Sequence, residues 1–330
     1  MTQPRYDVIA IGNAIVDVIA NTDDEFIAEE QLTKGGMQLV DEQRADALYS
    51  AMGPAREISG GSAANTLAGM SMLGRQCAFI GQVADDQLGQ VFAHDIRATG
   101  IDFDVAARAG EPATARCLIF VTPDAERTMN TFLGASQFLP ADLIDSDAIQ
   151  SAGILYLEGY LWDPEEPRAA MRRAIEHAKA AGRKVAFTLS DAFVIDRYRD
   201  DFISLINDGL IDIMFANEVE ISSLAQIEDF EEAVAAISAK VPLLVVTRSE
   251  KGAIAVKDGK RHEVAAEPVE KLVDTTGAGD LFAAGFLAGL SEGREIDACL
   301  KMGAICAAEV ISHYGARPEA DIKALVAEAL

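Results

Sequence analysis

Short apolar runs alternate with segments of helical spacing through the second half of the chain. Strands are predicted at 154–158, 184–188, 211–216 and 243–247, with helices at 164–181, 193–207, 218–226 and 230–240. This alternation is typical of βαβ units, whose crossovers make neighbouring strands parallel. Runs at 6–11 and 77–83 extend the same pattern toward the N-terminus. The sequence therefore predicts an α/β fold with a mostly parallel central sheet and helices on both faces.

A second group of predicted strands does not follow this alternation of strands and helices. The segments 15–19, 37–40, 115–121 and 127–133 contain polar residues among apolar ones, and the last two read as a hairpin through the turn 122–126. We expect a small separate sheet, made from discontinuous segments at about 14–40 and 108–135. It would cover the strand ends of the large sheet as a lid, with 1–330 forming a single domain.

The charge balance excludes several classes of partner. The 330 residues include 28 basic and 53 acidic side chains, for a formal net charge of -25. Such a chain is not expected to bind nucleic acid or an anionic membrane. The four cysteines form no C-x-x-C pair, no apolar signal segment begins the chain, and no run approaches a membrane span. We expect a cytoplasmic protein with reduced core cysteines.

The segment 274–286, D-T-T-G-A-G-D-L-F-A-A-G-F, reads as a glycine turn that opens into a helix. Backbone N–H groups of Gly277, Ala278 and Gly279 at a helix start would form a site for an anion such as a phosphoryl group. Asp280 beside that site could accept the proton of an attacking hydroxyl. The alternative is an ordinary turn, with Asp280 as a helix-start charge.

Two further stretches carry polar residues without an obvious structural role. Gly61, Ser62 and Asn65 open a helix whose small residues permit close packing, and the Asn65 amide could bind a hydroxylated ligand or satisfy the helix start. Asp17 lies within an otherwise apolar strand. A buried carboxylate needs a partner, so Asp17 either faces solvent or binds ligand hydroxyls.

Polar motifs follow two of the predicted strands. Asn217 and Glu220, in N-E-V-E after 211–216, could hold Mg²⁺ directly or through water, or could simply cap a helix. After 243–246 comes a polar turn that could contact phosphates or merely link two strands. Its candidate residues are Thr247, Arg248, Ser249 and Gly252.

Motifs of other enzyme classes are missing from the sequence. There is no G-x-x-x-x-G-K-[ST], no G-x-G-x-x-G after the first strand, no histidine pair with metal-ligand spacing and no G-x-S-x-G. A P-loop enzyme is excluded, and a dinucleotide-dependent dehydrogenase is disfavoured.

Two long segments resemble the signatures of the ribokinase-like (PfkB) carbohydrate kinase family. They are G-G-S-A-A-N-T-L-A-G-M-S-M-L-G at 60–74 and D-T-T-G-A-G-D-L-F-A-A-G-F at 274–286, and N-E-V-E at 217–220 is similar to the family's N-x-x-E motif. The resemblance covers essentially the whole chain. It implies an ATP- and Mg²⁺-dependent kinase with a ribokinase-like α/β domain and a β lid.

The resemblance also assigns roles to individual residues. It implies that Asp280 is the catalytic base, that 277–279 form the anion hole, that Asn217 and Glu220 organise Mg²⁺ and phosphate, and that 247–252 bind ATP. The sugar hydroxyls would be held by Asn13, Asp17, Gly61, Ser62 and Asn65. Some members of the family bind a monovalent cation such as K⁺ near the turn that here contains Asp274 and Thr276.

Within the family the chain is most similar to the adenosine kinases, through G-N-A-I-V-D-V at 12–18, M-Q-L around Gln38 and T-L-S-D-A-F-V-I at 188–195. This implies phosphate transfer to the 5′-hydroxyl of adenosine, giving AMP. The resemblance implies that Gln38, Arg116 and Tyr160 also bind the substrate. Arg116 falls near the expected nucleoside, and Tyr160 lies near the position of an aromatic ring that stacks on adenine. An arginine facing the site would favour an acidic acceptor, whereas an outward arginine would have no such effect.

Other functions stay open at this point. The acceptor could be ribose, fructose or an acidic sugar such as 2-keto-3-deoxygluconate, and a non-catalytic nucleoside or sugar sensor could use the same fold. The sequence is compatible with either a monomer or a homodimer.

Overall fold

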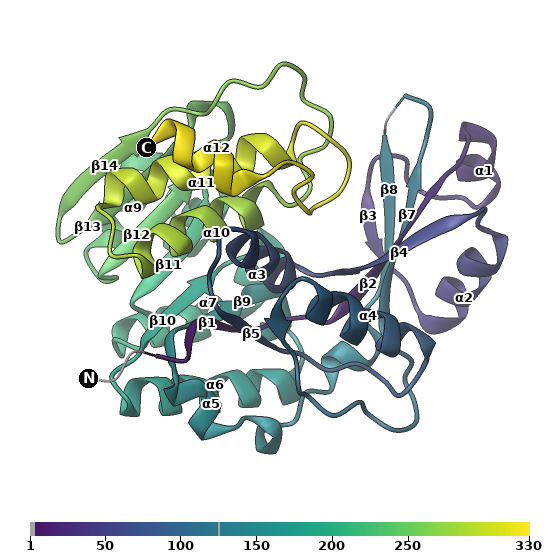
Figure 1. Cartoon of the computed structure of the whole chain (residues 1–330), viewed down its shortest axis with the longest axis horizontal. Coiled ribbons are helices and arrows are strands. Elements are labelled where there is room, and N and C mark those ends of the chain that lie inside the picture. The colour runs from purple at the N-terminus through teal and green to yellow at the C-terminus, as the bar shows by residue number, and fades with distance from the viewer. Residues whose placement is uncertain (1–3, 125) are drawn as a thin grey trace.

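The computed structural model describes residues 4–124 and 126–330, and two β-sheets organise them (Figure 1). The large sheet has the strand order β14-β13-β12-β11-β10-β9-β1-β5-β6. Its strands are β1 (Tyr6–Ile11), β5 (Cys77–Ile80), β6 (Ile101–Asp102), β9 (Ala152–Glu158), β10 (Lys184–Thr188), β11 (Ile213–Asn217), β12 (Leu243–Thr247), β13 (Ala253–Lys257) and β14 (Lys260–Val264). Pairing is parallel from β12 to β6, and β13 and β14 add an antiparallel edge. The predicted α/β fold with a mostly parallel sheet is confirmed.

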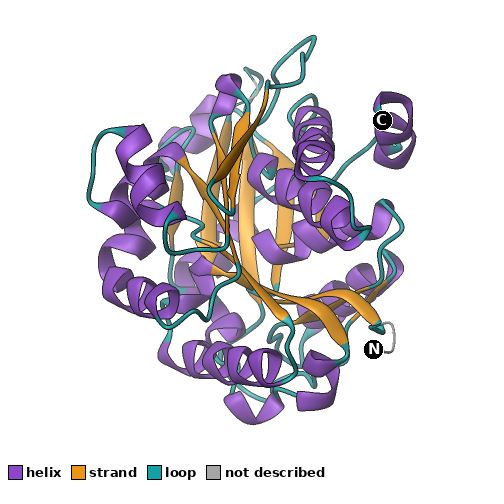
Figure 2. Cartoon of the chain, turned by 90° about the vertical axis from the view of Figure 1, so that its left-hand side faces the viewer, coloured by secondary structure: helices purple, strands orange, loops and turns teal. Residues whose placement is uncertain are grey.

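Alternate residues of the large sheet belong to two separate cores. In β1, Val8 and Ala10 join one apolar cluster, whereas Ile9 and Ile11 join the other. One cluster lies under α3 (Ser62–Met72), α4 (Gln87–Ala98), α10 (Ala278–Ser291), α11 (Ile296–Val310) and α12 (Ile322–Ala329). The other lies under α5 (Ser146–Gln150), α6 (Glu165–Ala180), α7 (Ala192–Asn207), α8 (Glu218–Ala225) and α9 (Phe230–Ser238). Helices thus cover both faces (Figure 2).

The small sheet stands apart from the large one, at the right of Figure 1. Its strand order is β3-β8-β7-β2-β4, with β2 (Ile15–Asn21), β3 (Met37–Leu39), β4 (Ala55–Gly60), β7 (Ala115–Val121) and β8 (Arg127–Phe132). The four predicted strands are present, and β4 adds a fifth from a segment in which no strand was predicted. Helices α1 (Asp24–Glu29) and α2 (Glu42–Ala51) cover its outer face, where Leu118 and Phe120 are buried with Ile27 and Leu48.

Five neighbouring parallel strands place polar residues at one edge of the large sheet. Asn13 follows β1, and Glu158, Thr188, Asn217 and Thr247 end β9, β10, β11 and β12. All five residues line one cavity, as expected for a ligand site at the carboxyl ends of parallel strands. No helix within 4–124 or 126–330 is both long and apolar enough to cross a bilayer.

Candidate active site

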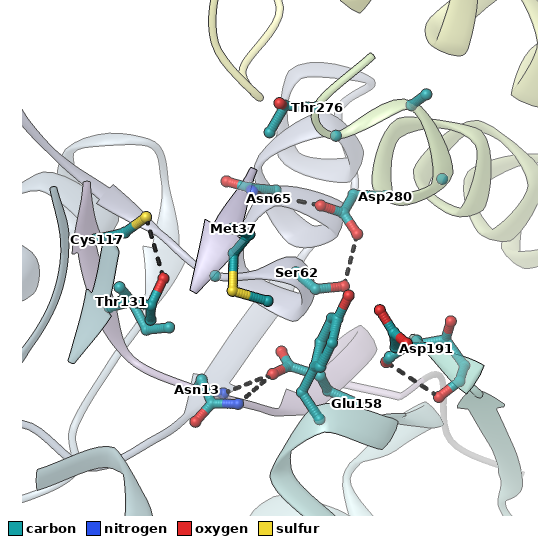
Figure 3. Close-up of a pocket in the computed structure, with 18 of the residues that line it drawn as sticks. Asn13, Met37, Ser62, Asn65, Cys117, Thr131, Glu158, Asp191, Thr276 and Asp280 are labelled. Carbon is teal, nitrogen blue, oxygen red and sulfur yellow. Dashed lines mark hydrogen bonds between the residues drawn. The ribbon is translucent and has the colours of Figure 1, made fainter. Parts of the chain in front are cut away.

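A cavity of about 590 Å³ lies between the two sheets (Figure 3). One wall is the inner face of the small sheet and is largely apolar. Its residues include Ile15, Met37, Leu39, Cys117, Ile119, Met129 and Leu133. The opposite wall carries the polar strand ends of the large sheet and the start of α10. The cavity therefore offers an apolar surface for a ring system opposite a polar surface for hydroxyls and phosphates.

Asp280 lies in the first turn of α10, where the sequence signature placed it. Its Oδ1 accepts a hydrogen bond from the Ser62 hydroxyl at 2.6 Å, and its Oδ2 accepts one from Asn65 Nδ2 at 3.4 Å. Burial raises the pKa of Asp280, whereas the two hydrogen bonds and the Arg317 guanidinium lower it, and the resulting pKa is about 6. Helices α3 and α10 pack closely because Gly69 leaves room for Leu281 and Ala284. A carboxylate with a pKa near neutrality is suited to act as a general base.

The glycine turn before α10 has two different glycines. Gly277 has φ 78°, and a Cβ there would lie 2.8 Å from Ala316, so conformation and packing both require glycine. Gly279 faces the cavity, and a Cβ there would project into open space. The Ala278 N–H already bonds the Thr275 carbonyl at 3.2 Å, which leaves the other first-turn N–H groups for an anion.

Asn13 is held by Glu158, a residue that the sequence analysis did not select. Glu158 Oε1 accepts hydrogen bonds from Asn13 Nδ2 at 2.6 Å and from its backbone N–H at 3.2 Å, and Oε2 accepts one from the Ala63 N–H at 2.9 Å. Burial raises the pKa of Glu158 to about 7. The only signal in the sequence was an acid ending the predicted strand 154–158. Glu158 joins the loop after β1 to the start of α3.

Asp17 reaches the cavity from β2 of the small sheet. Burial raises its pKa to about 6, although Arg127 and Arg317 lower it. A Cβ on Gly60 would lie 2.4 Å from its carboxylate, and Gly61 adopts φ 97° against the Asn13 carbonyl. Asp17 therefore does not face bulk solvent, and its carboxylate is available to ligand hydroxyls.

Asn217 and Glu220 form a capping box at the start of α8. Asn217 Oδ1 accepts from the Glu220 N–H at 2.8 Å, while the Glu220 carboxylate accepts from the Asn217 side chain at 2.7 Å and from its backbone N–H at 3.1 Å. Burial raises the pKa of Glu220 to about 7, and the nearby Asp191 charge raises it further. The residues cap the helix and also line the cavity, so the capping alternative is observed and their role toward Mg²⁺ stays a prediction. Within 4–124 and 126–330, no group of three His, Cys, Asp or Glu residues is arranged to hold a metal ion.

Two predicted substrate contacts do not reach the cavity. Arg116 forms an ion pair with Asp46 on the outer face of the small sheet, and the neighbouring residue Cys117 lines the cavity instead. Gln38 likewise points away and donates to Asn130 at 2.7 Å, while Met37 and Leu39 line the cavity. Because side chains alternate between the faces of a strand, each prediction selected the wrong face.

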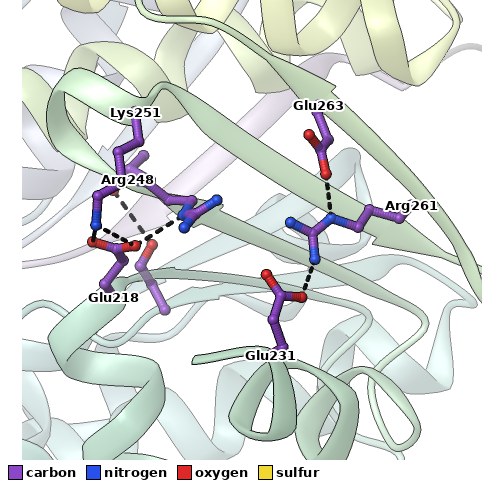
Figure 4. Close-up of polar contacts among 8 residues, drawn as sticks. Glu218, Glu231, Arg248, Lys251, Arg261 and Glu263 are labelled. Atoms are coloured by element: carbon purple, nitrogen blue, oxygen red, sulfur yellow. Dashed lines mark hydrogen bonds and ion pairs between the residues drawn. The ribbon is translucent and has the colours of Figure 1, made fainter. Parts of the chain in front are cut away.

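Of the four residues predicted to bind ATP at the end of β12 and in the turn after it, only Thr247 lines the cavity. Arg248 instead contacts Glu218 at 2.9 Å (Figure 4). Arg248 also lies over the ring of Phe230, which does not line the cavity. Ser249 and Gly252 belong to the tight turn between β12 and β13 and do not line the cavity. Gly252 has φ 85°, and a Cβ there would overlap the Val264 carbonyl, so its requirement is structural. Tyr160, in contrast, lines the cavity as predicted.

The proposed cation residues lie beside the glycine turn. Asp274 is buried and accepts hydrogen bonds from the Thr276 hydroxyl at 2.7 Å, the Thr276 N–H at 3.0 Å and the Gly315 N–H at 3.0 Å. It also forms an ion pair with Arg127 of β8. Thr276 lines the cavity and Asp274 does not.

The charged side chains among the described residues that line the cavity all have one sign. Six carboxylates line it, and none of the described lining residues is lysine or arginine. The six are Asp17, Glu158, Asp163, Asp191, Glu220 and Asp280. An acidic acceptor would meet this surface without a cationic partner.

Comparison with known proteins gives one consistent result. The model of the pfkB family carbohydrate kinases matches residues 6–323. The crystal structure of adenosine kinase from Sinorhizobium meliloti is 47% identical, with a TM-score of 0.91 over 99% of this chain and 100% of that one. A probable sugar kinase from Rhizobium etli CFN 42 is 46% identical, with a TM-score of 0.92 over 99% of each chain. The 5-dehydro-2-deoxygluconokinase of Shouchella clausii (strain KSM-K16) is 30% identical over 98% of this chain and 96% of that protein.

Proposed function

The chain belongs to the pfkB family of carbohydrate kinases and is a sugar or nucleoside kinase, and we propose that it transfers the ATP γ-phosphate to the 5′-hydroxyl of adenosine. The observation that carries the chemistry is the Asp280 carboxylate at the cavity end of α10, one residue from the open position at Gly279. A general base and a helix-start anion site within one turn are the two groups that alcohol phosphorylation requires.

In the proposed reaction, Asp17 and Asn65 bind the ribose hydroxyls and direct the primary hydroxyl toward Asp280. Asp280 accepts the proton as the hydroxyl oxygen attacks the γ-phosphorus, and ADP leaves on the opposite side. First-turn N–H groups of α10 stabilise charge on the transferring group. Positioning contributes more than base strength because the transition state of phosphoryl transfer is loose.

The family implies Mg²⁺ with the nucleotide, and the residues present fit an ion held through water. Mg²⁺ bound to ATP would neutralise phosphate charge, which matters in a cavity lined by carboxylates. Glu220 and Asn217 would bind its water ligands from the start of α8, and Asp191 lies on the same wall.

The apolar wall supports a nucleoside acceptor over an acidic sugar. Met37, Leu39, Cys117 and Ile119 present carbon and sulfur atoms to the cavity, which suits the faces of an adenine ring. The keto-sugar acid would need a cation for its carboxylate, and Arg116 points away from the cavity. A neutral sugar such as ribose or fructose remains the second candidate, since its hydroxyls would use the same polar wall.

The test is ADP release from Mg-ATP with a panel of acceptors: adenosine, inosine, guanosine, ribose, fructose and 2-keto-3-deoxygluconate. Adenosine should give the highest kcat/KM. Preference for a neutral sugar would change the acceptor and leave the kinase in place. Nucleoside binding without turnover of any acceptor would support the sensor function instead.

A monovalent cation near Asp274 and Thr276 is a separate part of the proposal. The Asp274 carboxylate is occupied by Arg127, Thr276 and Gly315, so K⁺ would take backbone carbonyls as ligands. Turnover in K⁺ compared with tetramethylammonium tests this requirement.

We also propose a cytoplasmic protein that is either a monomer or a homodimer. The cysteines are free and buried, which fits a reducing compartment. Helices α1 and α2 cover the outer face of the small sheet, so that face does not offer the open surface that a lid-to-lid dimer would use. Sedimentation would measure the oligomeric state.

A further inference from the structure

Three consecutive residues of the segment between α11 and α12 contact different parts of the candidate site. The Gly315 N–H donates to Asp274 Oδ2 at 3.0 Å, and Ala316 packs against Gly277 of the glycine turn. Arg317, the third residue, extends toward α3 and β4. No motif in the sequence analysis pointed to this segment, although it lies against the base of the anion site.

Arg317 bridges two elements with its planar guanidinium group. Its Nε donates to Asn65 Oδ1 at 2.8 Å, and its terminal NH2 group donates to the Ser59 carbonyl at 2.7 Å and to the Ser59 hydroxyl at 3.0 Å. Asn65 and Ser59 are both buried. Arginine makes such a forked contact because its donors are fixed in one plane, which a lysine cannot reproduce.

The contact with Oδ1 determines which end of the Asn65 amide faces the base. With Oδ1 bound to Arg317, the Nδ2 group points to Asp280 Oδ2 at 3.4 Å. If the amide flipped, its carbonyl oxygen would face a carboxylate, and two acceptors cannot share a hydrogen bond. Arg317 therefore selects the orientation in which Asn65 can donate to Asp280.

The contact with Ser59 ties the same guanidinium to the end of a lid strand. Ser59 is in β4, and its N–H and hydroxyl donate to Asp95 of α4 at 2.8 and 2.6 Å. Gly60 and Gly61 follow directly and lead into α3. A chain of hydrogen bonds thus runs from α4 through β4 and Arg317 to Asn65 and the base.

We infer that Arg317 is a positioning residue for phosphoryl transfer: it orients the Asn65 amide toward Asp280 and joins that pair to the end of lid strand β4. The inference rests on the proposed function, because it assigns Asp280 the role of base.

The charge of Arg317 supports this role. It lowers the pKa of both Asp280 and Asp17, against the effect of burial on each. The negative charge of Asp280 in turn raises the pKa of four neighbouring groups and so disfavours their ionisation. They are Asp17 from β2, Tyr156 and Glu158 from β9, and Tyr160. Arg317 is the cation whose charge lowers the pKa of Asp280.

The experiment compares Arg317→Met and Arg317→Lys with the unmodified protein, using the acceptor that the latter turns over best. Arg317→Met should lower kcat/KM by about 10- to 100-fold through misplacement of Asn65. It should also move the acid limb of the pH profile upward from about pH 6 by roughly one unit, since the base loses its nearby cation. Arg317→Lys should keep the limb near its original pH and still lose turnover. The matched control is Arg261→Met, because Arg261 pairs with Glu231 and Glu263 on the surface (Figure 4).

The measurements distinguish a positioning role of Arg317 from a role in folding alone. A merely structural arginine would reduce the amount of folded protein without moving the pH limb, and that result would overturn the inference. Unchanged kcat/KM in Arg317→Met would also overturn the inference. The proposed kinase function would still be supported by turnover of an acceptor by the unmodified protein. If Arg317→Met does not fold, the test rests on Arg317→Lys. Full turnover in that variant would show that the contact of the guanidinium group with both Asn65 and Ser59 is not needed, and would overturn the inference. A native protein silent with every acceptor would overturn both the inference and the proposed function.

Discussion

The Ser62 hydroxyl donates a hydrogen bond to Oδ1 of Asp280 at 2.6 Å, although 218 positions separate the two residues. The second oxygen of the carboxylate is held more loosely, by Asn65 Nδ2 at 3.4 Å. One oxygen is therefore fixed, and the other can accept a hydrogen bond from a substrate hydroxyl. The start of α3 and the start of α10 thereby form a single polar unit within the cavity.

Asp280→Asn should abolish the proposed proton transfer while the nucleotide still binds. The amide keeps the size of the side chain but cannot accept a proton, so we expect kcat to fall by about 10²- to 10⁴-fold. ADP release and nucleotide binding by calorimetry would measure the two effects. Asp297→Asn is a suitable control because Asp297 is exposed and contacts only His262 among the described polar partners. Loss of nucleotide binding together with turnover would contradict the role of Asp280 as a base.

Asp17→Ala should weaken the binding of the acceptor more than the binding of ATP. Asp17 lies on the lid side of the cavity, where its carboxylate can accept hydrogen bonds from ligand hydroxyls. A lost hydrogen bond to a charged group corresponds to about a 10- to 100-fold rise in the KM for the acceptor. Equal losses for acceptor and ATP would indicate that Asp17 only supports the small sheet.

The polar strand ends could be predicted because their position follows from the topology. Once the βαβ rhythm is recognised, residues such as Asn13 and Asn217 must gather at the carboxyl edge of the sheet. Asp280 could be selected because a helix start within a glycine-rich turn is a local feature. Local pattern and global fold agree at these positions.

Which face of a strand each side chain occupies was harder to predict. Arg116 and Cys117 are neighbours in β7, and a displacement of one residue exchanges the outer face for the cavity. Both strand faces are buried, one under α1 and α2 and the other toward the cavity, so polarity does not distinguish them. Glu158 was missed for a different reason: its partner Asn13 is 145 residues away, and only the tertiary structure brings them together.

The ligand-free protein should become more stable as the pH falls from 7.5 to 5.5. Glu158 and Glu220 are buried, and the pKa of each is about 7 in the folded protein against an ordinary value of 4.5. The folded state therefore binds more protons than the unfolded state over this range, and the free energy of unfolding decreases as the pH rises. The net charge of -25 acts in the same direction. We expect Tm to be about 5 °C higher at pH 5.5.

Thermal denaturation across this pH range would test the relationship. Glu220→Gln should reduce the change in Tm, because the variant has one fewer buried group to titrate. Glu232→Gln is the matched control, since Glu232 is exposed on α9. A Tm that falls on acidification from pH 7.5 to 5.5 would contradict the assignment of raised pKa values to these two acids.

The buried ion pair between Arg127 and Asp274 should connect the lid to the glycine turn energetically. Arg127 begins β8, and Asp274 lies just before the turn that leads into α10. The two side chains are each 6% exposed, so removal of one leaves the other charge buried without its partner. Arg127→Met should reduce the free energy of unfolding by about 3 kcal/mol, toward the lower end for such pairs, because Asp274 retains the donors of Thr276 and Gly315.

A double-mutant cycle would isolate this connection. Asp274→Asn should also destabilise the protein, since it leaves Arg127 uncompensated, and the double variant should lose less than the sum of the two single variants. The expected coupling free energy is about 1 to 3 kcal/mol, measured by chemical denaturation. The exposed pair Arg5 and Asp102 gives a comparison in which the coupling should be well below that value, because solvent screens it. Strictly additive losses at Arg127 and Asp274 would mean that the pair does not couple the lid to the anion site.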